Sequence, residues 1–114
     1  MLAKPQRLEK RQVEYILKKG QSSTSKLFIL KFTENNEEKS KYATIISSKI
    51  SKKAVERNKL RRQIYEIIRT ALKESTPEKN LNLVLIPKKQ ILSSSFEEIQ
   101  EDIKEIIIQN GKIN

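Results

Sequence analysis

Residues 54–74 carry the pattern that most constrains the fold, because an apolar stripe at helical spacing lies in the most basic part of the chain. The apolar residues are Leu60, Ile64, Ile67, Ile68, Ala71 and Leu72. They follow Leu60 at +4, +7, +8, +11 and +12, a spacing that places all of them on one face of a helix. We therefore predict a helix over residues 54–74 that buries one side against a sheet or other helices.

Three apolar segments, at residues 27–33, 42–46 and 81–86, predict strands. A polar turn separates the first two, and we expect these two to form an antiparallel hairpin. The third is apolar nearly throughout and stops at Pro87, so we predict a central strand that is buried on both faces. Because a helix precedes it, we expect this strand to pair in parallel with the second. Residues 21–25 are polar and predict a loop.

Two further helices complete the predicted order. The first covers about residues 6–19 and stops at Gly20. The last begins at Ser95, which forms a capping box with Glu98, and stops at Gly111. The order helix-strand-strand-helix-strand-helix predicts an α+β fold in which helices pack on one small sheet.

The net charge is concentrated in one part of the chain. The protein has 24 Lys and Arg against 14 Asp and Glu, which gives a net charge of +10. Residues 49–73 hold 9 basic and 2 acidic side chains, a net charge of +7, whereas residues 74–114 hold 5 and 7, a net charge of −2. Focused positive charge favours a polyanionic partner, usually a phosphate backbone. The alternative is that the positive charge reflects only a general bias of the amino-acid composition toward Lys and Ile, without a polyanionic partner.

The sequence has no Cys and no His, which excludes disulfides, thiol catalysis, thiolate metal sites and a Ser-His-Asp triad. The serines at 93–95 have no base beside them, so an enzyme that uses them is the least favoured class. No run of about 18 apolar residues is present, so we expect no membrane partner. The N-terminus leads into charged residues without an apolar signal region, which predicts a cytoplasmic protein.

The polar face of the predicted 54–74 helix is rich in guanidinium groups, whose forks chelate phosphate oxygens. Arg62, Tyr65 and Arg69 fall opposite the apolar stripe, and Arg57 fits the first turn, where a helix favours anions. In the alternative interpretation the face is only solvated, and Glu66 pairs with Arg62 or Arg69. The residues predicted to bind a polyanion are Lys49, Lys52, Lys53, Arg57, Asn58, Lys59, Arg61, Arg62 and Arg69, and the resemblance described next implies that this polyanion is RNA.

The run Ala54-Val55-Glu56-Arg57-Asn58-Lys59-Leu60-Arg61-Arg62, followed by Glu66 and Arg69, resembles the arginine-asparagine-arginine motif of the protein subunit of bacterial ribonuclease P. Arg7-Leu8 with Lys18-Lys19-Gly20 is similar to the first helix of that family, and residues 46–51 are similar to the strand that leads into the motif. Size, charge and element order agree, so the resemblance covers most of the chain.

The resemblance implies an α-β-β-(β)-α-β-α sandwich with a small mixed sheet of about four strands and a left-handed β-α-β crossover, as in a ribosomal protein domain. We expect the fourth strand near residues 47–50. The resemblance also implies a single RNA-binding domain over residues 1–114. This domain would bind the catalytic RNA and the 5′ leader of precursor tRNA and assist leader removal, while the RNA carries catalysis with magnesium, which it mainly binds itself. A non-catalytic RNA-binding module, such as a ribosomal-protein-like domain, is the alternative.

The resemblance further implies a leader cleft between the sheet and the first helix. Val13 and Leu17 stand where the family has phenylalanines, Tyr65 replaces an arginine and Ser51 a glycine, and about one extra residue precedes Ala54. Aromatic residues elsewhere, at Phe28 and Phe32 or at Tyr15 and Tyr42, are candidates to stack on bases instead, with burial in the core as their alternative. The predicted cleft residues are Arg7, Arg11, Val13, Leu17, Phe28 and Phe32.

Overall fold

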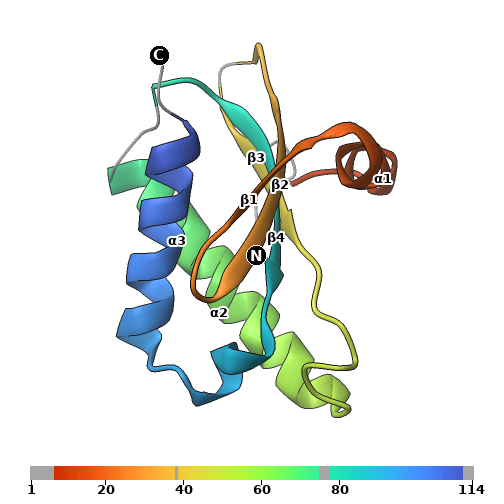
Figure 1. The fold of residues 1–114 in the computed structure, drawn as a ribbon, viewed down its shortest axis with the longest axis vertical. Coiled ribbons are helices and arrows are strands. Elements are labelled where there is room, and N and C mark those ends of the chain that lie inside the picture. The colour runs from red at the N-terminus through yellow and green to blue at the C-terminus, as the bar shows by residue number, and fades with distance from the viewer. Residues whose placement is uncertain (1–6, 38, 75–77, 112–114) are drawn as a thin grey trace.

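The computed structural model describes residues 7–37, 39–74 and 78–111. Its elements in chain order are α1 (Lys10–Lys19), β1 (Gln21–Thr24), β2 (Phe28–Glu34), β3 (Lys41–Thr44), α2 (Ala54–Glu74), β4 (Leu81–Pro87), the 3-10 helix η2 (Lys89–Ser93) and α3 (Phe96–Asn110). Figure 1 shows α2 and α3 on one face of the sheet and α1 on the other. The α+β fold and the bounds of α2 are as predicted.

The strand order in the sheet is β1-β2-β4-β3. β4 pairs antiparallel with β2 and parallel with β3, which confirms the predicted central strand and its parallel partner. The predicted hairpin between residues 27–33 and 42–46 is wrong, because β4 lies between these two strands. β4 has apolar side chains on both faces, so a central place with neighbours on both edges buries it more fully than an edge place.

The fourth strand is β1, in the segment predicted to be a loop, and residues 47–50 form a turn instead. β1 is an edge strand and is largely exposed, which suits its polar composition. Gly20 ends α1 as predicted and leads directly into β1. A Cβ atom at Gly20 would lie 2.6 Å from the Ile16 carbonyl oxygen and 2.9 Å from that of Phe32, so only glycine fits this close turn.

The N-terminal end of α1 differs from the prediction, because α1 begins at Lys10 and not near residue 6. Arg7 forms a parallel bridge with Tyr42, and the Leu8 N–H donates to the Tyr42 carbonyl oxygen at 3.2 Å. The described residues before α1 therefore extend the edge of the sheet at β3 rather than the helix. Residue 6, the first of the predicted helix, lies outside the described residues.

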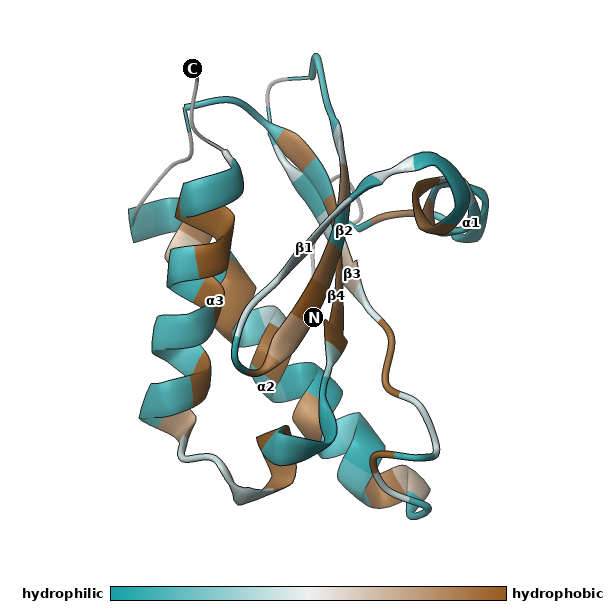
Figure 2. Cartoon of the chain, in the orientation of Figure 1, coloured by the Kyte–Doolittle hydropathy of each residue, from teal (hydrophilic) through white to brown (hydrophobic). Residues whose placement is uncertain are grey.

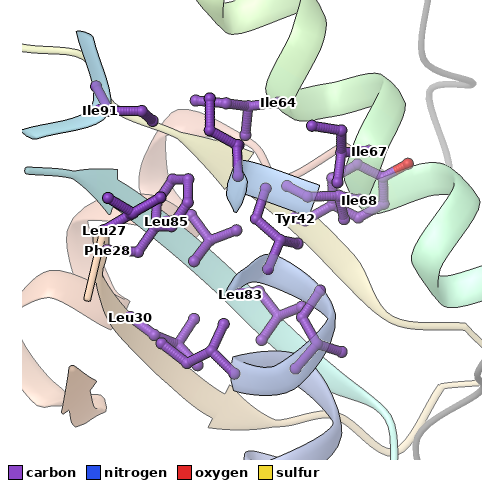
Figure 3. Close-up of a cluster of buried hydrophobic side chains, with 14 of the residues drawn as sticks. Leu27, Phe28, Leu30, Tyr42, Ile64, Ile67, Ile68, Leu83, Leu85 and Ile91 are labelled. Atoms are coloured by element: carbon purple, nitrogen blue, oxygen red, sulfur yellow. The ribbon is translucent and has the colours of Figure 1, made fainter. Parts of the chain in front are cut away.

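The larger hydrophobic core lies between the sheet and the α2–α3 layer (Figure 3). Phe28, Leu30 and Phe32 alternate along β2 with partly exposed residues and all face this core. The brown, hydrophobic sides of α2 and α3 in Figure 2 also turn toward the sheet. A smaller cluster on the other face of the sheet joins Ile16 of α1 to Val84 of β4. The sheet is therefore covered on both sides.

The N-terminus of α3 has the predicted capping box. The Glu98 N–H donates to Ser95 Oγ at 3.1 Å, and the Ser95 N–H donates to Glu98 Oε1 at 2.9 Å. Hydrogen bonds to the carboxylate, first from the Ser95 backbone N–H and then from the Ser95 side chain, hold the pKa of the Glu98 carboxyl below its ordinary value. In the part of the chain that the structure describes, no helix is long and apolar enough to span a bilayer.

Candidate nucleic-acid interface

Ser51 organises the loop that leads into α2. Its hydroxyl accepts from the Lys53 N–H at 3.2 Å and donates to Glu56 Oε1 at 2.5 Å. Its carbonyl oxygen accepts from Arg57 Nη1 at 2.8 Å. Arg57 is consequently half-buried and tied to the loop, so it fixes the loop against the first turn of the helix. The serine found where the related motif has glycine thus has a structural role here.

Exposed cations surround this junction of loop and helix. Arg61 donates from Nη1 to Asn58 Oδ1 at 2.7 Å, which holds both side chains over the helix surface. Among residues 7–37, 39–74 and 78–111, no acidic side chain forms an ion pair with the exposed cations of this junction. We call these cations the basic surface: Lys49, Lys52, Lys53, Lys59 and Arg62.

Arg69 lies further along α2 than Arg62, and its guanidinium is already paired with an acidic side chain. It donates to Glu66 from Nε at 3.2 Å and also from Nη2. The hydrogen bond from Arg69 lowers the pKa of the Glu66 carboxyl, and the same contact raises the pKa of Arg69. The pairing considered for Glu66 is therefore formed with Arg69 and not with Arg62, which leaves the Arg62 guanidinium available to an external anion.

Tyr65 lies differently from the expectation that it faces solvent with Arg62. It is half-buried, and its ring packs 6.2 Å from that of Tyr42, measured between centroids. The Tyr65 hydroxyl accepts from the Thr44 N–H at 3.4 Å, so the side chain leans onto β3. Tyr42 itself is fully buried, and this burial raises the pKa of its phenol to about 12. Neither ring is free to stack on a base.

A cleft of about 1290 Å³ opens between α1 and the sheet. Arg7 and Arg11 line it, as predicted for two of the six cleft residues, together with Lys10. Tyr15 of α1 also lines the cleft and is 60% exposed. Glu34 adds an acidic side chain on the β2 side and pairs with Lys79 at 2.8 Å. Glu9 lines it as well, so the cleft combines cations, an exposed aromatic ring and two carboxylates.

The other four predicted cleft residues are placed elsewhere. Phe28 and Phe32 are 0% and 6% exposed and belong to the larger core, so their assignment to the cleft is wrong. The cause is the alternation of β2, which turns these rings toward α2 and α3 while Thr33 faces α1. Val13 packs against the smaller core cluster, and Leu17, although exposed, is not among the residues that line the cleft.

Polar residues of the sheet form the floor of the cleft and were not predicted. Thr33, Asn82 and Lys41 line it from three neighbouring strands, β2, β4 and β3. The sequence did contain a signal, since Asn82 is the single polar residue within the apolar run 81–86. A polar side chain in a central strand needs a polar environment, and here the cleft supplies it.

The fold and these two surfaces define a basic α+β protein built to bind a nucleic acid. Within the described ranges, no group of three or more His, Cys, Asp or Glu side chains is arranged to hold a metal ion. Exposed guanidinium and ammonium groups on one helix and its entry loop, with a basic cleft containing an exposed ring, are suited to contact a phosphate backbone and unstacked bases.

Comparison with known proteins identifies the family. Residues 2–110 match the family described as Ribonuclease P. The ribonuclease P protein component of Rickettsia prowazekii is 31% identical over 108 residues, which cover 88% of this chain and 89% of that protein. The solved ribonuclease P protein of Thermotoga maritima superposes with a TM-score of 0.78 at 26% identity, covering 90% of this chain and 96% of that one. The chain belongs to the ribonuclease P protein family.

Structural similarity extends to a second solved protein of the same kind. The ribonuclease P protein of Staphylococcus aureus has a TM-score of 0.72 at 22% identity, and this match shows the shared fold. Family membership makes the chain a protein component of an endoribonuclease and implies an RNA partner.

Proposed function

We propose that this protein binds the catalytic RNA of ribonuclease P through the basic surface and the 5′ leader of precursor tRNA through the cleft between α1 and the sheet. In this proposal the RNA subunit performs the cleavage with magnesium that it mainly binds itself, and the complex acts in the cytoplasm. The observation that supports the proposal best is the absence of acidic partners for the exposed cations of the basic surface within the described residues.

The physical role follows from electrostatics. A catalytic RNA and a precursor tRNA repel each other, because both carry a phosphate at every nucleotide. A protein that presents cations on two surfaces releases counterions from both partners when it binds, which makes their association more favourable. Arg57, tied to Ser51, keeps the loop and the helix in one arrangement, so the backbone that carries the cations does not have to be ordered on binding.

The side chains of this protein agree with a mechanism in which the RNA carries out catalysis and the protein binds. The chain has no His and no Cys, the side chains that most often act as a base or nucleophile near neutral pH. Its contribution is instead a set of positively charged side chains held in fixed places on the fold. The protein therefore promotes the reaction by holding its two RNA partners together.

Reconstitution with the catalytic RNA tests this proposal. Cleavage of the leader at low magnesium should be faster with the protein than without it, since protein cations then replace part of the screening that magnesium supplies. Arg62→Gln should reduce this stimulation, whereas Lys104→Gln, the same charge change on α3, should not. An equal rate with and without the protein would refute the proposal, and RNA binding without stimulation would favour the non-catalytic RNA-binding module.

A further inference from the structure

The orientation of the Asn82 side-chain amide is fixed by a chain of hydrogen bonds. Asn35 Oδ1 accepts from the Glu37 N–H at 2.5 Å, so the other end of the Asn35 amide must be Nδ2. Asn35 Nδ2 donates to the Lys39 carbonyl oxygen and to Asn82 Oδ1, both at 2.9 Å. Because Nδ2 can only donate, the atom of Asn82 that faces Asn35 must be the oxygen.

Asn82 consequently directs its Nδ2 group away from Asn35. The side chain is half-buried and lines the cleft. In the described part of the chain, no acceptor takes either of its two Nδ2 hydrogens, while its oxygen is already engaged. A half-buried amide that is locked at one end and open at the other is a preorganised hydrogen-bond donor.

Neighbouring residues extend this donor into a polar row across the sheet. Thr33 lies opposite Asn82 in the β2–β4 register and Lys41 lies opposite it in the β3–β4 register, so all three side chains are on the same face. Two residues further along β4, on the same face of the sheet, Val84 belongs to the smaller core cluster. Thr33, Asn82 and Lys41 therefore form the floor of the cleft at the place where the apolar packing under α1 ends.

We propose that Asn82 donates to an acceptor atom on the edge of a nucleobase, and that the base stacks on Tyr15 in the cleft. The inference rests on the proposed function, since it gives the single-stranded leader as the source of the base. Tyr15 lines the same cleft from α1 and is 60% exposed, as a stacking platform requires. Asn82 is a specificity-determining residue in this proposal, and Asn35 is a positioning residue.

A base edge fits Asn82 better than a phosphate does. The exposed cations Arg7, Lys10 and Arg11 come from α1 and the segment before it, at the side of the cleft, whereas Lys41 on the floor is paired with Glu37 at 3.0 Å. A strand whose phosphates meet these cations turns its bases toward the sheet. A neutral amide on the floor then meets the base, and side-chain amides are among the groups that read base edges.

Two substitutions distinguish base recognition by Asn82 from a purely structural role of this residue. Asn82→Leu has a similar volume and removes the donor and the contact with Asn35. Asn82→Asp keeps an oxygen that accepts from Asn35 but replaces the open donor by an acceptor. We therefore expect the aspartate variant to remain folded and to reverse the preference, toward a base that presents an exocyclic amino group. Thermal unfolding of both variants checks the fold.

The experiment uses the reconstituted holoenzyme and precursor tRNAs in which each leader nucleotide is changed in turn to A, C, G or U. With the unaltered protein, we expect one leader position at which bases differ about three- to tenfold in kcat/KM, the range of one hydrogen bond. Asn82→Leu should remove this difference at that position alone, and Asn82→Asp should change which base is preferred. A uniform loss over all bases and positions, as for a phosphate contact or a purely structural role, overturns the inference.

Failure of the inference is distinguishable from failure of the proposed function. The function fails if the unaltered protein does not stimulate cleavage, whatever the leader sequence. In that event the inference is tested on the protein alone, with single-stranded oligoribonucleotides of each base as probes. Equal base preferences of the unaltered protein and Asn82→Asp, in either assay, overturn it.

Discussion

Removal of the negative charge of Glu66 should strengthen RNA binding. The Glu66 carboxylate now holds Arg69 through two hydrogen bonds, and this contact lowers the pKa of the carboxyl. Both side chains are exposed, Arg69 by 46% and Glu66 by 61%, so an RNA phosphate can reach the guanidinium. In the variant Glu66→Gln the competing anion is lost, and Arg69 becomes available to phosphate.

The magnitude follows from one added phosphate contact. Each contact steepens the slope of log K against log salt by about 0.7 to 0.9 units. Taken from about 1 M salt, where the counterion term vanishes, down to about 0.15 M, one contact corresponds to about four- to fivefold tighter binding. Arg62, which has no acidic partner in the described residues, should show the opposite change, so Arg62→Gln should make the slope shallower by the same amount.

Measurement of the dissociation constant for the catalytic RNA between about 50 and 500 mM salt tests this reasoning. The double variant Glu66→Gln/Arg69→Gln is the critical control. If the gain comes from Arg69, this variant should return to the slope of the unaltered protein. A Glu66→Gln slope equal to that of the unaltered protein, or a double variant that keeps the gain, would refute the assignment of Arg69 as a neutralised RNA contact.

Three further predictions concern stability. Phe28→Ala should lower the free energy of unfolding in urea by about 3–5 kcal/mol, because the ring is fully buried; a loss below about 1 kcal/mol would contradict its place in the core. Tyr42→Phe should leave stability unchanged or raise it by about 1 kcal/mol, since the buried hydroxyl has no partner among the described residues, and the phenol that titrates near pH 12 should disappear from the absorbance titration. Glu98 has a lower pKa when folded, so its contribution is present above the ordinary value of 4.5 and is lost as pH falls through the folded pKa; thermal unfolding below that pH should show a smaller decline for Glu98→Gln than for the unaltered protein.

Local sequence patterns were sufficient to predict those helices and strands whose ends depend only on nearby residues. The apolar stripe and the following Thr76-Pro77 predicted a helix over residues 54–74, which are the bounds of α2; residues 75–77 lie outside the described part of the chain. The continuous apolar run 81–86 predicted a central strand, because only burial on both faces accommodates it. Ser95 and Gly20 marked helix ends through capping chemistry that depends on a few adjacent residues.

Strand order and the composition of the cleft were not predictable in the same way. Adjacent strands 27–33 and 42–46 looked like a hairpin, and only the later segment β4, which inserts between them, determines otherwise. In β2 both faces of the sheet are covered, so alternation alone does not show which face Phe28 takes. Tyr15, a candidate for base stacking from the sequence, does line the cleft, but Thr33, Lys41 and Asn82 meet there only because three strands pair through long-range contacts.

The separation of charge explains how the chain can bind RNA while its C-terminal third is acidic. Exposed carboxylates of α3, such as Glu97, Glu101 and Glu105, lie on the face of the sheet opposite α1 and the cleft (Figure 1). The molecule extends 37 × 29 × 25 Å, whereas salt screens exposed charges beyond about 8–10 Å. The acidic helix therefore does not cancel the field at the cleft. Instead it makes the surface of α3 less favourable for RNA to approach than the cleft or the basic surface of α2.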